Sequence, residues 1–126
     1  MWGIVRILLV EDEPAARAAM ARLLRRAGAN VVTAGDGSEG LNHLLGGHFD
    51  VLLTDLHMPG GIDGFELIEA THRLPLSNRP KRVVAISGQY DRGVISDLVQ
   101  HSAATDFFPK PVDLNSLLDS IGGPVN

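Results

Sequence analysis

Residues 4–14 read Ile4-Val5-Arg6-Ile7-Leu8-Leu9-Val10-Glu11-Asp12-Glu13-Pro14. The first seven are nearly all β-branched residues or leucine, which is typical of a buried strand. Three acids and a proline follow at once, and proline is favoured in the first turn of a helix. The segment therefore predicts a buried strand that ends in an acidic loop and leads directly into a helix.

The alternation of strand and helix continues along the chain. Apolar residues recur with helical spacing from Ala16 to Ala27, and Gly28 suits the end of that helix. The expected strands are residues 4–10, 31–34, 49–54, 82–86 and 105–108. The expected helices are residues 14–27, 38–45, 63–73, 91–101 and 113–121, and residues 75–80 form a turn-rich connection.

Five strands that alternate with five helices predict an α/β fold, a doubly wound parallel sheet with helices on both faces. The strands at residues 4–10, 49–54 and 82–86 are nearly all apolar, as strands covered on both faces should be. A chain of 126 residues is expected to form one domain.

Composition excludes several classes of protein. With 44% hydrophobic and 21% charged residues, the chain is not disordered throughout. It has no cysteine, which excludes disulfides, a thiolate nucleophile and cysteine zinc sites. No apolar run is long enough for a membrane helix, and Met1–Arg6 lacks the basic start of a signal peptide, so we expect a cytoplasmic protein. The net charge of −4 argues against a nucleic-acid module.

Polar and charged side chains stand where the expected strands end. These residues are Glu11 and Asp12 after the first strand, Asp55 after the third, Ser87 after the fourth and Lys110 after the fifth. In a doubly wound sheet, ligands bind beyond the carboxyl ends of the strands. Each residue alone is unremarkable, but their joint placement in four separate segments predicts a site.

The chemistry of this set favours phosphoryl transfer. Two carboxylates 4 Å apart repel by about 4 kcal/mol at an effective dielectric of 20, and Mg²⁺ relieves that repulsion by binding carboxylate oxygens. Lys110 offers a point charge to a phosphate, and Ser87 offers a hydroxyl donor. Asp55 is then a plausible nucleophile toward phosphorus.

Four motifs give the chain a resemblance to the receiver domain of two-component response regulators. They are Leu9-Val10-Glu11-Asp12-Glu13, Leu53-Thr54-Asp55-Leu56-His57-Met58-Pro59, Ala85-Ile86-Ser87-Gly88 and Phe107-Phe108-Pro109-Lys110-Pro111. The resemblance implies a flavodoxin-like (βα)5 fold with strand order 2-1-3-4-5, a receiver domain at residues 4–121 and a tail at 122–126. It also implies a signalling protein rather than an enzyme, with slow self-dephosphorylation.

By the same resemblance, Asp55 matches the phosphoacceptor. Glu11 and Asp12 match the acidic pair that holds Mg²⁺ (or Mn²⁺) together with Asp55, with Asp12 the more direct ligand. His57 matches the position whose backbone carbonyl binds the metal. Ser87 matches the hydroxyl residue that turns toward the phosphoryl group.

Three further positions complete the matching set. Lys110 matches the invariant lysine, which the family typically joins to the next residue, here Pro111, by a cis peptide. Phe107 matches the aromatic switch residue. His57 and Gln89 lie two positions past Asp55 and Ser87, where we expect them to tune the lifetime of the acyl phosphate.

The resemblance also implies partners. A sensor histidine kinase or a phosphotransfer protein would supply the phosphoryl group. Helix 91–101, strand 105–108 and helix 113–121 would form the responding surface, which binds a downstream protein or a second copy. Its expected residues are Arg92, Ile95, Val99, Phe107 and Leu114. No direct contact with nucleic acid or membrane is expected.

The sequence departs from the family pattern at four places. Glu11 replaces the commoner Asp, and its longer side chain favours contact with the metal through water. The loop at residues 58–64 is one residue longer than usual. Gly88 stands where Ala is more common, which should loosen the loop, and Phe107 has no hydroxyl.

Other readings fit less well. A phosphatase with an aspartyl nucleophile needs a second acid where His57 stands, and a flavin module would find phosphate repelled by the acids at residues 11–13. The possibility of a pseudo-receiver that only binds a partner stays open, although such proteins typically lack part of the acid, serine and lysine set.

The histidines and the arginines do not indicate further sites. The five histidines (His43, His48, His57, His72 and His101) have no metal-ligand spacing. The four arginines of helix 14–27 (Arg17, Arg22, Arg25 and Arg26) indicate a solvated face.

Overall fold

A computed structural model describes residues 4–88 and 104–122. The described strands are β1 (Arg6–Val10), β2 (Asn30–Ala34), β3 (Val51–Asp55), β4 (Arg82–Ser87) and β5 (Asp106–Pro109). The described helices are α1 (Pro14–Arg26), α2 (Gly37–Gly46), α3 (Gly64–Thr71), the 3-10 turn η1 (Leu76–Asn78) and α5 (Leu114–Ser120). The expected helix at residues 91–101 lies outside the described residues.

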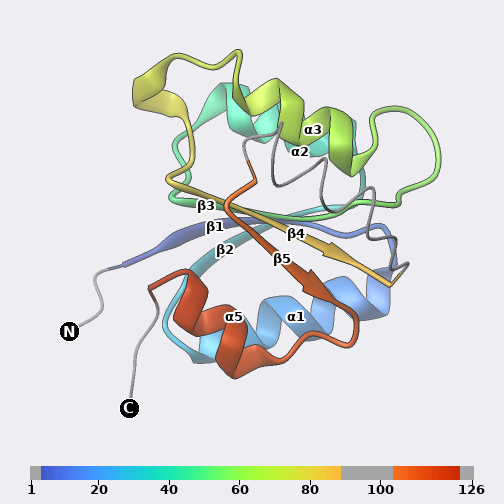
Figure 1. Ribbon diagram of the computed structural model, residues 1–126, viewed down its shortest axis with the longest axis vertical. Helices are drawn as coiled ribbons and strands as arrows, with labels where there is room; N and C mark the ends of the chain where they lie inside the picture. Colours follow the sequence, from blue (N-terminus) through green and yellow to red (C-terminus); the bar gives the residue numbers. More distant parts are fainter. Residues whose placement is uncertain (1–3, 89–103, 123–126) are drawn as a thin grey trace.

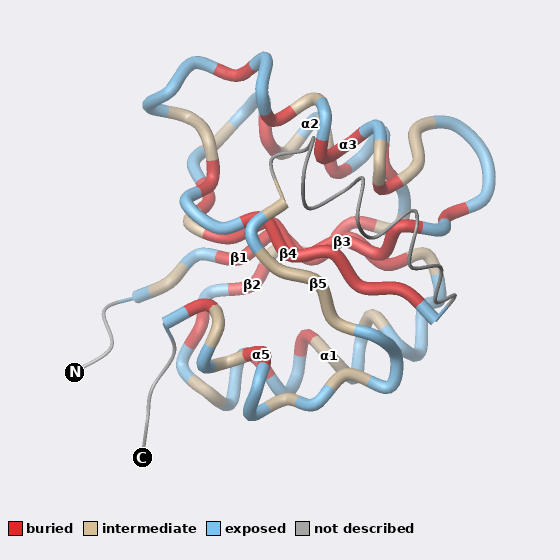
Figure 2. The backbone as a smooth tube through the Cα atoms, viewed as in Figure 1, coloured by how far each residue is buried: buried red, intermediate tan, exposed pale blue. Residues whose placement is uncertain are grey.

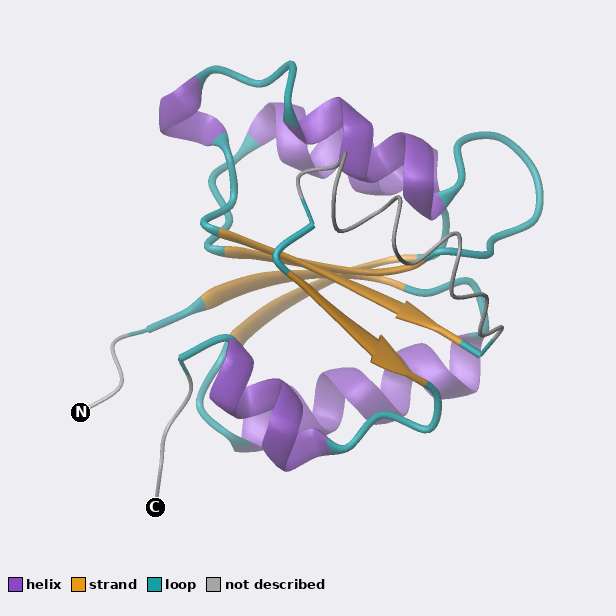
Figure 3. Cartoon of the chain, viewed as in Figure 1, coloured by secondary structure: helices purple, strands orange, loops and turns teal. Residues whose placement is uncertain are grey.

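The five strands form one parallel sheet in the order β2-β1-β3-β4-β5, as predicted. In Figure 1, α2 and α3 lie above the sheet and α1 and α5 lie below it. The same two helical layers enclose the strands in Figure 3. The expected doubly wound α/β architecture is therefore confirmed. Within the described residues, no helix has the length and apolar character needed to cross a bilayer.

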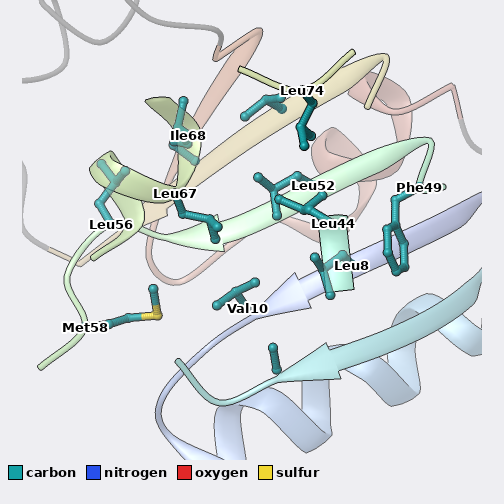
Figure 4. Close-up of a cluster of buried hydrophobic side chains, with 13 residues drawn as sticks. Leu8, Val10, Leu44, Phe49, Leu52, Leu56, Met58, Leu67, Ile68 and Leu74 are labelled. Atoms are coloured by element: carbon teal, nitrogen blue, oxygen red, sulfur yellow. The ribbon is translucent and has the colours of Figure 1, made fainter. Parts of the chain in front are cut away.

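Successive side chains of each central strand pack on opposite faces of the sheet. Leu8 and Val10 of β1 join the cluster under α2 and α3, whereas Ile7 and Leu9 join the cluster above α1 and α5. This period of two is what a strand dictates. Figure 2 shows the result, with the central strands buried along their length, and Figure 4 shows the side chains of the first cluster.

Polar caps fix where the helices begin. Asp36 caps α2, Asp113 caps α5, and Asp63 with Glu66 forms a capping box at α3. Gly28 has a φ of +103°, the left-handed conformation that ends α1 as expected.

The bounds differ from prediction by a few residues at some ends. The first strand begins at Arg6 rather than Ile4, and the third helix ends at Thr71 rather than Arg73. The turn-rich connection at residues 75–80 contains η1. Pro109 is the last residue of β5, where the absent N–H of proline is tolerated at a sheet edge.

Candidate functional site

The carboxyl ends of four strands bring the predicted residues to one edge of the sheet. Asp55 pairs with Ile86 and Ser87 pairs with Pro109, so the ends of β3, β4 and β5 lie side by side. The arrowheads of β4 and β5 in Figure 1 point to this edge. The Lys110 N–H donates to the Ser87 carbonyl at 2.9 Å, which extends the ladder one residue beyond β5 and fixes the lysine at the site.

One ammonium group holds two buried carboxylates. Lys110 Nζ lies 2.6 Å from Asp55 Oδ2 and 3.1 Å from Glu11 Oε2. Glu11 is only 3% exposed and Asp55 5%, whereas a third of the Lys110 side chain is exposed. The sequence predicted Lys110 as a phosphate ligand. In the structure it also bridges two of the predicted acids, a contact that spans 99 residues and has no local sequence signal.

Burial and charge set the protonation of this group. Burial raises the pKa of the Glu11 carboxyl, and the hydrogen bond from Lys110 opposes that rise only in part. Partial burial alone would lower the pKa of Lys110, but its hydrogen bonds to Asp55 and Glu11 outweigh burial and raise it. Lys110 is therefore held firmly in its charged form.

The acidic cluster fits a divalent cation. One carboxylate oxygen each from Glu11, Asp12 and Asp55 lies within 4.8 Å of the other two. Lys110 bonds to two of these carboxylates, Glu11 and Asp55, and its single positive charge leaves negative charge in excess. Oxygen donors with excess negative charge are the ligands that Mg²⁺ prefers. Glu11, Asp12 and Asp55 are thus suited to hold this ion.

The loop after β3 is held against its neighbours at two glycines. The Gly64 N–H donates to the Leu56 carbonyl at 3.2 Å, and a Cβ at Gly64 would lie 2.0 Å from the Asp55 carbonyl oxygen. A Cβ at Gly37 would lie 2.1 Å from the Ile62 carbonyl oxygen. Because both contacts are with backbone, only glycine fits. The sequence indicated neither contact, since Gly37 was expected in the turn before helix 38–45 and Gly64 within helix 63–73.

The third acid of the acidic loop has a structural role. The Glu13 carboxylate accepts hydrogen bonds from the Ala15 and Ala16 N–H groups and so caps α1. These backbone hydrogen bonds lower the pKa of Glu13, with the bond from Ala16 the larger cause.

Two of the arginines expected to face water also donate to backbone carbonyls. Arg17 donates to the Glu11 carbonyl at 2.9 Å, and Arg25 donates to the Val31 carbonyl at 2.8 Å. Long side chains reach across a surface from positions that helical spacing assigns to solvent. Arg17 is half-buried, whereas Arg22, Arg25 and Arg26 are exposed, as predicted.

The remaining predicted residues surround the cluster. Ser87 is buried at the end of β4. The His57 N–H donates to Asp55 Oδ1 at 3.0 Å, while its exposed ring meets Phe65 edge-on at 6.0 Å. Phe107 is half-buried in β5 and packs against the cluster under α2 and α3. Gln89 lies outside the described residues, as do Arg92, Ile95 and Val99. The Lys110–Pro111 peptide is cis, as the resemblance implies.

Comparisons with known proteins agree with this arrangement. The sequence model of one protein family, the response regulator receiver domain, matches residues 7–122 of this chain. The chain is 36% identical over 118 residues to the CAI-1 autoinducer sensor kinase/phosphatase CqsS of Vibrio cholerae, covering 92% of this chain and 17% of that protein. It is 35% identical over 115 residues to the transcriptional regulatory protein TcrA of Mycobacterium tuberculosis, covering 90% of this chain and 43% of that protein.

Solved structures share the fold. A response regulator receiver protein from Pseudomonas putida superposes with a TM-score of 0.83 at 27% identity, covering 97% of this chain and 98% of that one. The chain spans less than half the length of the two curated relatives.

Proposed function

Because this chain belongs to the response regulator receiver domain family, a family of phosphorelay signalling modules rather than classical enzymes, we propose that it carries its signal by accepting a phosphoryl group on Asp55. The observation that carries the proposal is the contact of the Asp55 carboxylate with Lys110 at 2.6 Å, inside a cluster of three carboxylates.

The geometry supports Asp55 as the nucleophile rather than Glu11 or Asp12. The His57 N–H binds one Asp55 oxygen and Lys110 binds the other, so the carboxylate is held in one orientation. An Asp55 oxygen forms a bond to phosphorus while the bond from phosphorus to the donor histidine nitrogen breaks. That nitrogen keeps the bonding electron pair and takes up a proton. Lys110 stays charged and offsets the added negative charge.

A bound Mg²⁺ would supply charge neutralisation and orientation of the phosphate oxygens. Asp12, Asp55 and, through its longer side chain, Glu11 would hold the ion, with the backbone carbonyl of His57 as a further ligand. Ser87 would donate to a phosphoryl oxygen from the end of β4.

The signal would leave the site through β5. Movement of Ser87 toward the phosphoryl group would free space for Phe107, which is half-buried one strand away. The surface around Phe107 and Leu114 would then change for a downstream protein or a second copy. Receiver domains act between histidine kinases and effectors, so the donor would be a sensor kinase or a phosphotransfer protein. A Phe107→Ala variant should still be phosphorylated but should discriminate less between partners.

His57 follows Asp55 by two positions, and its ring is exposed. We expect His57 and Gln89 to set the lifetime of the acyl phosphate, and exchange of both without a change in hydrolysis rate would contradict this. The cytoplasmic location stays a prediction.

The test is the intact mass after incubation with acetyl phosphate, with and without Mg²⁺. The proposal expects a gain of one phosphoryl group that requires Mg²⁺ and is absent from Asp55→Asn, which keeps the size of the side chain. A gain that persists in Asp55→Asn would move the nucleophile elsewhere. No gain, together with no Mg²⁺ binding, would favour a pseudo-receiver.

A further inference from the structure

Arg17 reaches from α1 to the backbone of the acidic loop. Its Nη1 donates to the Glu11 carbonyl at 2.9 Å, although the spacing of α1 assigns this position to solvent. The side chain is half-buried, unlike that of Arg22 on the same helix. Arg17 therefore places a charged group with five donors against a backbone carbonyl next to the site.

The turn after β2 leaves room for this guanidinium. A Cβ on Gly35 would lie 3.1 Å from Arg17 Nη1 and 3.7 Å from Glu39 Oε2. The same Glu39 oxygen accepts the Gly35 N–H at 3.0 Å. The Arg17 guanidinium thus lies against the backbone of Gly35, near the Glu39 carboxylate.

The carbonyl that Arg17 holds belongs to the peptide joining Glu11 to Asp12. A peptide is planar, so fixing its carbonyl fixes the direction in which the next residue leaves. The Glu11 N–H is already held by the Ala34 carbonyl at 3.1 Å. With both ends of Glu11 anchored, the plane of the peptide that leads into Asp12 is held in place by Ala34 and Arg17.

We propose that Arg17 is a positioning residue for the metal site, which sets the affinity for Mg²⁺ by orienting Asp12 through the Glu11 carbonyl. The inference rests on the proposed function, since it assigns a support to the same site. Outer contacts that orient metal ligands typically change metal affinity by about 10- to 100-fold. Arg17→Met, which removes the donor and keeps the length, should weaken Mg²⁺ binding by about tenfold or more.

The charge of Arg17 alone predicts the opposite change in Mg²⁺ affinity. Removal of a cation near an acidic site strengthens the attraction for Mg²⁺, by a few-fold at most in salt. Arg22→Met is the matched control, because Arg22 is exposed on the same helix and loses the same charge. Gly35→Ala is a second probe that keeps every charge, since its methyl group at 3.1 Å from Arg17 Nη1 would push the guanidinium by a few tenths of an ångström.

The experiment measures Mg²⁺ binding by titration calorimetry on the full chain and on the three variants, at a temperature where thermal unfolding shows all to be folded. We expect weaker binding in Arg17→Met and Gly35→Ala, and unchanged or slightly tighter binding in Arg22→Met. At saturating Mg²⁺, the phosphorylation rate of Arg17→Met with acetyl phosphate should return to the wild-type plateau.

Two results would overturn the inference in different ways. Unchanged or tighter binding in Arg17→Met, with normal binding in the wild type, would refute the role of Arg17 and leave the proposed function intact. Absence of Mg²⁺ binding in the wild type would refute both.

Discussion

The close contact between the start of α3 and the end of β3 makes Gly64→Ala a demanding test of the site. The new Cβ would lie 2.0 Å from the Asp55 carbonyl oxygen and 2.7 Å from the Leu56 Cα, where ordinary contact begins at 3.4 Å. Both neighbours are backbone atoms, so no side-chain rotation relieves the overlap. Either α3 or the residue that we propose as phosphoacceptor must move.

The magnitude follows from two opposed effects. Overpacking a core by extra carbon atoms costs about 1–3 kcal/mol, and the backbone contact places this substitution at the upper end. Replacing glycine by alanine within a helix returns about 1 kcal/mol. We therefore expect a net loss of about 2 kcal/mol in the free energy of unfolding, or about 8 °C in Tm.

Urea unfolding and thermal melts measure this loss, and the rate of phosphorylation at saturating Mg²⁺ reports the position of Asp55. Gly46→Ala is the matched control, because Gly46 is also helical and a Cβ there meets nothing within 4 Å. It should be neutral or slightly stabilising. If Gly64→Ala were as stable as Gly46→Ala and accepted phosphate at the wild-type rate, the packing argument would be refuted.

Further predictions concern the charged residues. Burial raises the pKa of Glu11 in the folded state, so between pH 4.5 and that raised pKa the folded protein binds more protons than the unfolded chain. The free energy of unfolding should therefore fall as pH rises through this range. Glu11→Gln should lack this decline in metal-free thermal melts. Glu13 has a lowered pKa, so its effect on stability has the opposite pH dependence: it stabilises the folded protein above pH 4.5, and this stabilisation is lost on acidification. Glu13→Gln should not show this loss at acidic pH. Lys110 has a raised pKa, so its stabilisation should persist below pH 10.5 and disappear at higher pH, and Lys110→Met should show no such loss. Asp12→Asn should weaken Mg²⁺ binding in calorimetry while raising the metal-free Tm, because it removes one of three mutually repelling carboxylates.

The sequence sufficed to predict the sheet and the residues that meet at its edge. Strands such as Val51–Asp55 are short and apolar, and a parallel sheet places all their carboxyl ends together, so Asp55 and Lys110 could be brought to one place without coordinates. The family motifs then supplied roles for these residues. The helix expected at residues 91–101 stays a prediction.

The sequence could not show how the site residues are supported. The bridge from Lys110 to Glu11 joins residues 99 positions apart, and its partners depend on side-chain reach rather than on spacing. The contact of Gly64 with the Asp55 carbonyl arises only once α3 lies against β3. Helical periodicity assigned Arg17 to water because it follows the position of Cα and not the far end of a long side chain.

These contacts explain how three mutually repelling carboxylates can be held in one arrangement. Glu11 and Asp55 are buried beside a third carboxylate, and the ammonium of Lys110, which bonds to both of them, does not balance the charge of all three. Besides the bonds of Lys110, the backbone beneath them is held where Gly64 packs against the end of β3 and where Arg17 bonds to the Glu11 carbonyl. Substitutions that spare every acid of the site should therefore still change how it binds a cation.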